Sequence, residues 1–145
     1  MKKFNFRFQR ILDFKQTIED LKRASYNTEI KEFNEEKDKL NIFIKEQEEI
    51  NKQRNSLTKQ STVKDLKIFN NYLNKMNEII IEQNSRVNVK KDEVEEAKQE
   101  LIKSVKEKRT FEKLKDKDYD QHLFELKRED EKIVDQLVSF NNSVK

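Results

Sequence analysis

The 145-residue sequence contains no glycine, no proline and no cysteine. Glycine and proline favour tight turns and interrupt helices, so their absence argues against a many-layered fold and favours long, uninterrupted helices. The lack of cysteine excludes disulfide bonds and thiol chemistry. No apolar run approaches the roughly 20 residues of a membrane-spanning helix, and the N-terminus lacks the apolar core of a signal peptide. We therefore expect a cytosolic protein without direct membrane insertion.

Motifs that carry chemistry are equally scarce. Without glycine the chain can form neither a glycine-rich phosphate-binding loop nor a nucleophile elbow. His122 is the single histidine, and on a charged helix we expect it to face solvent. We therefore expect no catalytic residue, no cofactor and no metal site, and a protein that is not an enzyme.

Hydrophobic residues make up 33% of the chain and charged residues 42%. This supply suits long helices that bury one apolar stripe better than it suits a globular core. Disorder is the alternative for so polar a chain, but its 10 phenylalanines and their spacing oppose it. The net charge is only +3, and the two signs are interspersed. Because nucleic-acid binding needs a basic face or run, we expect no nucleic-acid partner.

Apolar residues recur at alternating steps of three and four, the heptad seam of a coiled coil, in two stretches. The clearest members are Ile11, Phe14, Ile18 and Leu21 in the first, and Leu66, Phe69, Leu73, Met76 and Ile80 in the second. A polar break separates them, and Thr62 with Asp65 fits a helix N-cap. The sequence thus predicts one domain: a helix over about 6–55, a loop over about 56–61, and a helix over about 63–140, forming an all-α antiparallel two-helix hairpin.

The two predicted helices differ in length, at roughly 75 Å and 117 Å for a rise of 1.5 Å per residue. With the loop centred near residue 59, residue i lies opposite about residue 118 − i, which places Phe8 near Thr110. The second helix beyond about Phe111 then overhangs. Because a buried aliphatic or aromatic side chain stabilises by about 1.5–3 kcal/mol, this overhang predicts a partner or self-association.

Phenylalanine occupies positions 4, 6 and 8, the alternation of a β-strand. No second strand exists to pair with it, so we favour a helix capped by Asn5, on which Phe4, Phe8 and Ile11 share a stripe and Phe6 points elsewhere. Either all of them pack on the second helix near 104–114, or Phe6 and the stripe's end form an apolar end for binding.

The middle of the hairpin holds more apolar residues than one seam can cover. Residues 42–44 and 79–81 are consecutive hydrophobic triplets. Tyr72, Met76 and Ile79 share one helix face near Phe43. These residues either thicken the core or form an exposed patch on the flank of the hairpin.

The opening KKFNFRFQRILDFK and the run KRTFEKLKDKDYDQHLFELKREDEKIVDQLV at 108–138 together resemble the FliJ family, a cytoplasmic coiled-coil component of flagellar type III export. The family's start, F-x-F-x-[LF]-Q-x-[VIL]-L, is met by Phe4, Phe6, Phe8, Gln9, Ile11 and Leu12. Near the end, Gln136 stands where the family usually has glutamate.

The resemblance implies a stalk similar to the two-helix part of a rotary ATPase. It implies as partners the hexameric flagellar export ATPase, the cytoplasmic domain of the export-gate protein FlhA, and export chaperones, with a place at the inner face of the cell membrane at the flagellar base and a role in motility and chemotaxis. With the overhang, it predicts ATPase-ring binding by Phe4, Phe6, Phe8, Ile11, Tyr119, Leu123, Leu126, Ile133 and Leu137. Export-gate binding is predicted for Phe43, Glu46, Ile50, Tyr72, Met76, Ile79 and Gln83, although Glu46 and Gln83 replace an aromatic residue and a histidine of the family's pattern.

Two other functions remain open. A self-associating coiled-coil scaffold would bury the overhang against further copies of the chain. A helical chaperone or RNA-binding arm would bind unfolded chains, or nucleic acid with steep salt dependence, although the balanced charge disfavours RNA.

Overall fold

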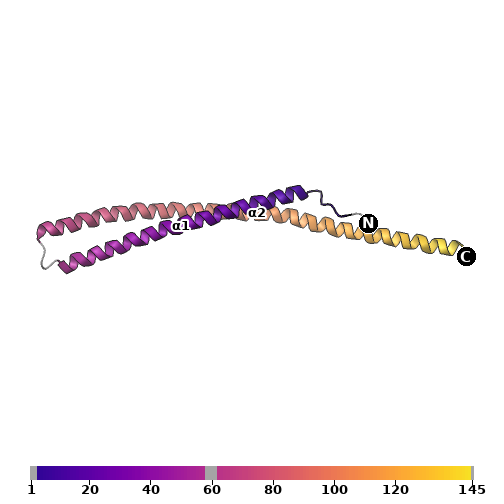
Figure 1. Ribbon diagram of the computed structural model, residues 1–145. Coiled ribbons are helices and arrows are strands. Elements are labelled where there is room, and N and C mark those ends of the chain that lie inside the picture. The colour runs from indigo at the N-terminus through magenta and orange to yellow at the C-terminus, as the bar shows by residue number, and fades with distance from the viewer. Residues whose placement is uncertain (1–2, 58–61, 145) are drawn as a thin grey trace. The chain divides into compact units, whose positions relative to one another are not determined.

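The computed structural model describes residues 3–57 and 62–144. Two helices account for most of them, α1 at Gln9–Leu57 and α2 at Val63–Val144 (Figure 1). No strand occurs in these described ranges. The helices pack antiparallel against each other, so the predicted all-α two-helix hairpin is confirmed.

The helix limits differ from the predicted ones at three ends. α1 begins at Gln9 rather than near residue 6, and it continues through Leu57 into the predicted loop. The rest of that loop, 58–61, lies outside the described residues. α2 continues past residue 140 to Val144, where the Ser143 hydroxyl donates to the Phe140 carbonyl at 2.8 Å instead of competing with the helix.

The start of α2 is capped as predicted. The backbone N–H of Asp65 donates to the Thr62 hydroxyl at 3.3 Å, and the N–H of Leu66 donates to the Thr62 carbonyl at 3.1 Å. The Thr62 hydroxyl thus satisfies one of the N–H groups that a helix start leaves without partners, and the Thr62 carbonyl accepts the first bond within the helix. Asp65 places its carboxylate near the positive end of the helix dipole.

The chain divides into two compact units that share the two helices. Lys22–Leu101 forms one, which we call the loop unit, and Met1–Leu21 with Ile102–Lys145 forms the other, which we call the terminal unit. Cross-helix contacts define the register: the residue numbers add up to 122 for Lys15–Glu107, Lys22–Glu100 and Glu32–Lys90, and to 119 for Glu36–Gln83 and Phe8–Phe111. The predicted register of 118 − i therefore agrees with these contacts to within about one helical turn. The helices end at Leu57 and begin at Val63, which centres the connection on residue 60 rather than 59.

The interior of the loop unit is partly polar. Met76 and Val87 are its buried hydrophobic residues, and Gln83, between them on α2, is only 3% exposed. Lys90 Nζ contacts three carboxylates, at 2.6 Å from Glu32, 2.8 Å from Glu93 and 3.5 Å from Glu29. Such pairs add directional contacts that an apolar seam lacks, so they specify which residues face each other.

The terminal unit also buries charge. Glu19 on α1 is buried and forms an ion pair with Lys108 on α2. The neighbouring Lys15 Nζ contacts Glu107 Oε2 at 3.0 Å. A buried carboxylate is tolerated only when a cation compensates for its lost hydration, so this pair holds the two helices in one register.

The phenylalanine-rich segment before α1 is not helical. Residues 3–6 have no regular structure, and Arg7 and Phe8 form a turn into the helix. Phe6 is 8% exposed, as expected in the alternative in which Phe6 and the whole stripe pack on the second helix. Alternation is the reason: outside a helix, every second side chain can face the same surface, so Phe4 and Phe6 can both reach α2.

This extended segment also lengthens the paired region. The ring of Phe4 lies 5.2 Å from that of Tyr119 and 5.5 Å from that of His122 (centroid distances), well beyond the predicted end near Phe111. An extended residue covers about 3.3 Å, against 1.5 Å in a helix, so a few non-helical residues reach far along α2. His122 is consequently half-buried rather than solvent-facing.

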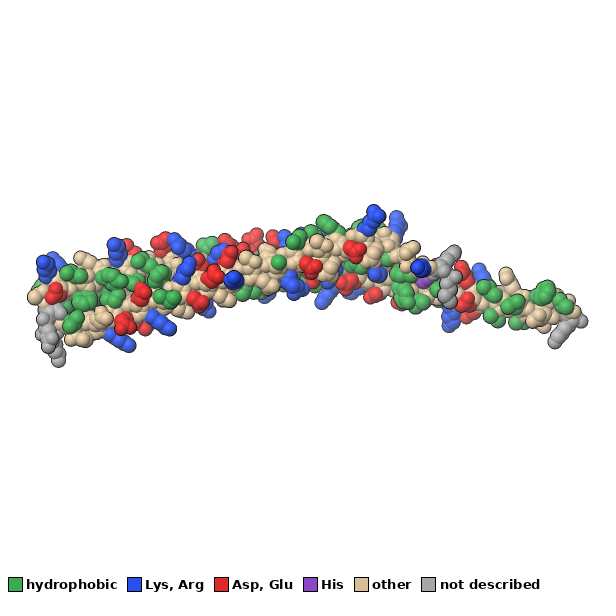
Figure 2. All heavy atoms as spheres, viewed as in Figure 1, with side chains coloured by type: hydrophobic (Ala, Val, Ile, Leu, Met, Phe, Trp, Pro, Cys, Tyr) green, Lys and Arg blue, Asp and Glu red, His purple; other side chains and the backbone are tan. Residues whose placement is uncertain are grey.

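Beyond His122, α2 makes no ring contact and no ion pair with the other described segments. Leu126 is half-buried, and every described residue from Lys127 to Val144 is exposed. Figure 2 shows hydrophobic side chains on this final stretch. The large exposed hydrophobic residues there are Ile133, Val134, Leu137, Val138, Phe140 and Val144. The predicted overhang is present, but it begins about one turn beyond Tyr119.

Candidate functional site

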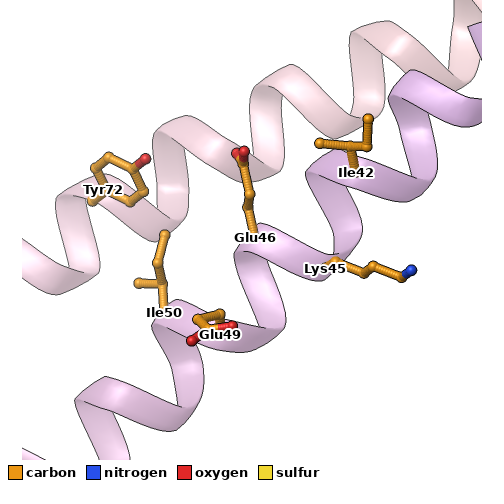
Figure 3. Close-up of a pocket in the computed structure, with 6 residues that line it drawn as sticks. All are labelled: Ile42, Lys45, Glu46, Glu49, Ile50 and Tyr72. Atoms are coloured by element: carbon orange, nitrogen blue, oxygen red, sulfur yellow. The ribbon is translucent and has the colours of Figure 1, made fainter.

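The first candidate surface lies on the flank of the loop unit. A hollow of about 460 Å³ lies between the two helices. As Figure 3 shows, α1 contributes most of its lining and α2 contributes Tyr72. Its residues are Ile42, Lys45, Glu46, Glu49, Ile50 and Tyr72. Three of them, Glu46, Ile50 and Tyr72, belong to the predicted export-gate set.

A second hollow adjoins the first and shares two of its residues. It has a volume of about 270 Å³ and is lined by Ile50, Ile68, Phe69 and Tyr72. All four side chains are apolar or aromatic, and Tyr72 and Ile68 are 50% and 59% exposed. We call the two hollows together the flank patch, defined by Ile42, Lys45, Glu46, Glu49, Ile50, Ile68, Phe69 and Tyr72.

The remaining predicted gate residues are placed differently. Met76 and Gln83 are buried in the helix interface, so they face α1 rather than solvent. Phe43 is half-buried, and Ile79 is exposed. Of the two interpretations of the middle region, the thickened core therefore applies to Met76 and Gln83, and the exposed patch applies to Tyr72 and Ile79.

Gln83 has a structural role that helical spacing alone did not indicate. Its Nε2 donates to the Glu36 backbone carbonyl at 2.9 Å and to the Glu36 carboxylate at 2.5 Å. The second bond is the main reason that the pKa of Glu36 lies below its ordinary value, with Lys39 acting in the same direction. Gln83 thus joins the two helices from inside the interface.

Sequence reasoning missed Lys45, Glu49, Ile68 and Phe69 as members of the flank patch. Phe69 had been assigned to the seam, where it is half-buried. Ile68 precedes it and points off the seam, a position that a heptad pattern treats as solvent-facing. Ile42 belongs to the hydrophobic triplet at 42–44. It is 54% exposed, so it is the residue of this triplet that the helix interface does not cover.

The second candidate surface is the phenylalanine segment with the facing part of α2, in the terminal unit. The ring of Phe4 meets that of Tyr119 edge to face and that of His122 at a tilt, and the ring centroids of Phe8 and Phe111 lie 6.2 Å apart. A hollow of about 660 Å³ lies over this segment. Its lining includes the predicted residues Phe4, Phe6 and Ile11 together with Asn5, Arg7, Gln9, Arg10 and Lys115.

The structure brings together only part of the predicted ATPase-binding set. Phe4 and Tyr119 contact each other, and Phe6 and Phe8 lie beside them with ring centroids 5.9 Å apart. The other members lie apart from them: Ile11 is on α1, and Leu123, Leu126, Ile133 and Leu137 follow the aromatic cluster on α2. The set is therefore an aromatic cluster that closes the helix pair, followed by a single helix with an uncovered apolar seam.

The described residues hold no group of three or more histidine, aspartate or glutamate side chains placed to bind a metal ion. None of the described helical segments combines the length and hydrophobicity that a membrane crossing requires. Exposed apolar surfaces of this kind are typical of proteins that bind other proteins. The structure therefore belongs to the class of helical hairpins that act by binding partners.

Comparison with known proteins identifies the family within this class. A family model described as "Flagellar FliJ protein" matches residues 4–145. The chain therefore belongs to the FliJ family, components of the cytoplasmic flagellar type III export apparatus. The resemblance of the two terminal stretches to this family is confirmed.

A solved structure described as a YscO homologue from Chlamydia trachomatis has a similar fold. It matches with a TM-score of 0.59 and 19% sequence identity, over 98% of this chain and 97% of the other. At this identity the likeness concerns the fold alone. None of the curated proteins compared matches the chain.

Proposed function

We propose that this protein is a stalk and adaptor of flagellar type III export. The terminal unit enters the hexameric export ATPase and promotes its assembly and ATP turnover, and the flank patch binds the cytoplasmic domain of the export gate. The protein also contacts export chaperones, acts without a reaction of its own, and lies at the inner face of the cell membrane at the flagellar base. Family membership supports the export role, and the two uncovered surfaces support two separate binding steps.

In this proposal the unpaired end of α2 is the segment that binds the export ATPase. Its seam residues Leu123, Ile133 and Leu137 are exposed although they keep heptad spacing. Burying such a side chain is worth about 1.5–3 kcal/mol, so several of them provide a strong driving force for insertion into a protein channel. The aromatic cluster around Phe4 closes the helix pair just before this end, which leaves a single helix to enter first.

The test is co-purification with the cognate export ATPase, together with its rate of ATP hydrolysis. We compare the full chain with the double variant Ile133→Ser, Leu137→Ser, whose seam is polar. The control is Lys132→Ser, Gln136→Ser, which makes the same number of changes on the same turns but removes no apolar group. Binding weaker by tenfold or more, roughly the loss of one buried aliphatic side chain, is expected for the seam variant only. Equal binding by all three chains, or unchanged hydrolysis on adding the wild type, would contradict the proposal.

A truncation should be made after Leu126 rather than near residue 110. Cutting at 110 would remove Phe111 and Tyr119, which contact Phe8 and Phe4, and would damage the paired region. A chain ending at Leu126 keeps these contacts and loses only exposed residues. Loss of ATPase binding by this shorter chain, with an unchanged melting temperature, is the expected result.

Self-association is the second candidate function, and the same exposed seam favours it. Two copies could bury Ile133, Leu137 and Phe140 against each other in a coiled coil. The mass of the purified chain, measured over a range of concentrations, separates the two functions. A concentration-dependent dimer that the seam variant abolishes favours a scaffold, and a monomer that binds the ATPase favours the stalk.

A further inference from the structure

Glu46 interrupts the apolar surface of the flank patch. On α1 it stands four residues from both Ile42 and Ile50, so the three side chains follow one another on the same face of the helix. Figure 3 shows Glu46 extending in the direction of α2, between Ile42 and Ile50, while Lys45 extends away from Glu46 and Tyr72. Any partner that covers the two isoleucines must therefore also cover this carboxylate.

The carboxylates of the patch have no cation within the described structure. Neither Glu46 nor Glu49 forms an ion pair with the residues described, although Lys45 lies beside both on α1. Elsewhere in the same unit, by contrast, the partly exposed Glu29, Glu32 and Glu93 all contact Lys90. The acids of the flank patch are thus available to a cation from outside the chain.

An entirely apolar partner fits this surface poorly. Covering Ile42 and Ile50 would strip water from the Glu46 carboxylate, and burying a charge without a partner is costly. A partner that supplies a cation at this place avoids the penalty and gains a charge-assisted hydrogen bond. The adjoining hollow between Ile50, Ile68, Phe69 and Tyr72 is mostly apolar, so it suits an apolar side chain of the same partner segment.

We infer that the flank patch binds a protein segment in which a lysine or arginine stands beside apolar side chains. The cation lies between Glu46 and Glu49, and the apolar neighbour fills the hollow formed by Ile50, Ile68 and Tyr72. This inference rests on the proposed function in taking the export gate's cytoplasmic domain as the protein that bears the segment, and it adds the chemistry by which the segment is recognised.

The experiment measures the affinity of the purified cytoplasmic domain of the cognate export gate for the wild-type chain and for Glu46→Gln. The substitution keeps the size of the side chain and removes its charge, and because Glu46 is exposed, folding is unaffected. Glu48→Gln is the matched control, since Glu48 is also exposed on α1 but does not line the hollow. Loss of a charge-assisted bond predicts roughly tenfold weaker binding for Glu46→Gln, and no change for Glu48→Gln. Raising the salt concentration should weaken wild-type binding more than that of Glu46→Gln.

The sign of the effect distinguishes the outcomes. A partner segment that is entirely apolar would bind Glu46→Gln more tightly than the wild type, because the substitution removes a charge that binding would bury. The same result is expected for a second copy of this chain that binds the patch through its apolar seam. Tighter or unchanged binding overturns the inference and leaves gate binding in place. A wild-type chain that does not bind the gate domain at all overturns both the gate step of the proposed function and the inference.

Discussion

The two units use the same pair of helices differently. In the loop unit, α1 and α2 accompany each other throughout, and the interior combines Met76 and Val87 with the polar contacts of Gln83 and Lys90. In the terminal unit the pair is closed by aromatic rings around Phe4 and Phe6, and α2 then continues alone. One unit therefore satisfies most of its groups internally, whereas the other leaves an apolar seam that only another molecule can cover.

This difference indicates how stability and binding are distributed. Polar contacts inside the loop unit set the register, and replacing them with apolar side chains need not weaken the fold. The aromatic cluster of the terminal unit, by contrast, provides most of the apolar burial at the end of the helix pair. The largest effect of a single substitution on stability is therefore expected in the terminal unit, and the smallest at the polar interior of the loop unit.

The first prediction concerns Phe6, the most buried residue of the N-terminal segment. Phe6→Ala should lower the free energy of unfolding of the terminal unit by about 3 kcal/mol, since it removes a buried aromatic ring and leaves a cavity. Hydrogen exchange should quicken between residues 102 and 122 and stay unchanged in the loop unit. Phe14→Ala is the control, because Phe14 is 60% exposed, and its effect should stay within about 0.5 kcal/mol. Equal effects of the two substitutions would show that the segment does not hold the helix pair.

The behaviour of this segment shows what the sequence could predict. The alternation of Phe4, Phe6 and Phe8 correctly signals an extended segment, but the absence of a partner strand led to the helical interpretation. Extended backbone does not need a sheet when its side chains have a helix to pack on, and no pattern within the segment reveals that helix. The second heptad seam, the Thr62 cap and the overhang were predictable because each depends on local spacing. The first seam was not, because its members Phe14 and Leu21 are 60% and 62% exposed.

The composition of the interface was less predictable. Helical spacing places Met76 and Gln83 on the face of Tyr72, yet only Tyr72 is exposed. Met76 belongs to the predicted heptad seam and Tyr72 does not, so membership of the seam, rather than a shared face, decides which side chain is covered. Glu19 and Lys108 show the same limit, because a buried ion pair between charged residues cannot be distinguished from solvated charges in the sequence alone.

The second prediction compares the acid sensitivity of the two units. Contacts with Lys90 and Lys15 hold the pKa values of Glu93 and Glu107 below the ordinary value of 4.5. Unfolded glutamates therefore take up protons at higher pH than the folded ones, so stability is full above about pH 4.5 and falls as pH drops through the lowered values. The pKa of Lys90 is raised, chiefly by its bond to Glu32, so its contribution is lost only above its ordinary value of 10.5. Urea unfolding between pH 7 and pH 3 measures the acid loss.

Removing the cations should affect the two units unequally. Lys90→Met leaves three neighbouring carboxylates without a cation, so this variant should be less stable than the wild type at pH 7 and should approach it at pH 3. Lys15→Met leaves one partly exposed carboxylate and should change the profile little. A Lys90→Met profile parallel to that of the wild type would show that the cluster does not carry the acid sensitivity.

The smallest effect on stability is expected for Gln83→Leu. Leucine has a volume similar to that of glutamine, and its apolar side chain can pack between Met76 and Val87. The free energy of unfolding should therefore change by no more than about 1 kcal/mol. The Glu36 carboxylate loses its main hydrogen-bond donor, so its pKa should rise toward the ordinary value, as a carbon-13 titration of that carboxyl can measure. Gln53→Leu, an exposed change in the same unit, should leave this pKa unmoved. An unchanged Glu36 pKa in Gln83→Leu would contradict the cross-helix bond, and a loss of more than about 2 kcal/mol would show that the polar contact stabilises the loop unit rather than only setting its register.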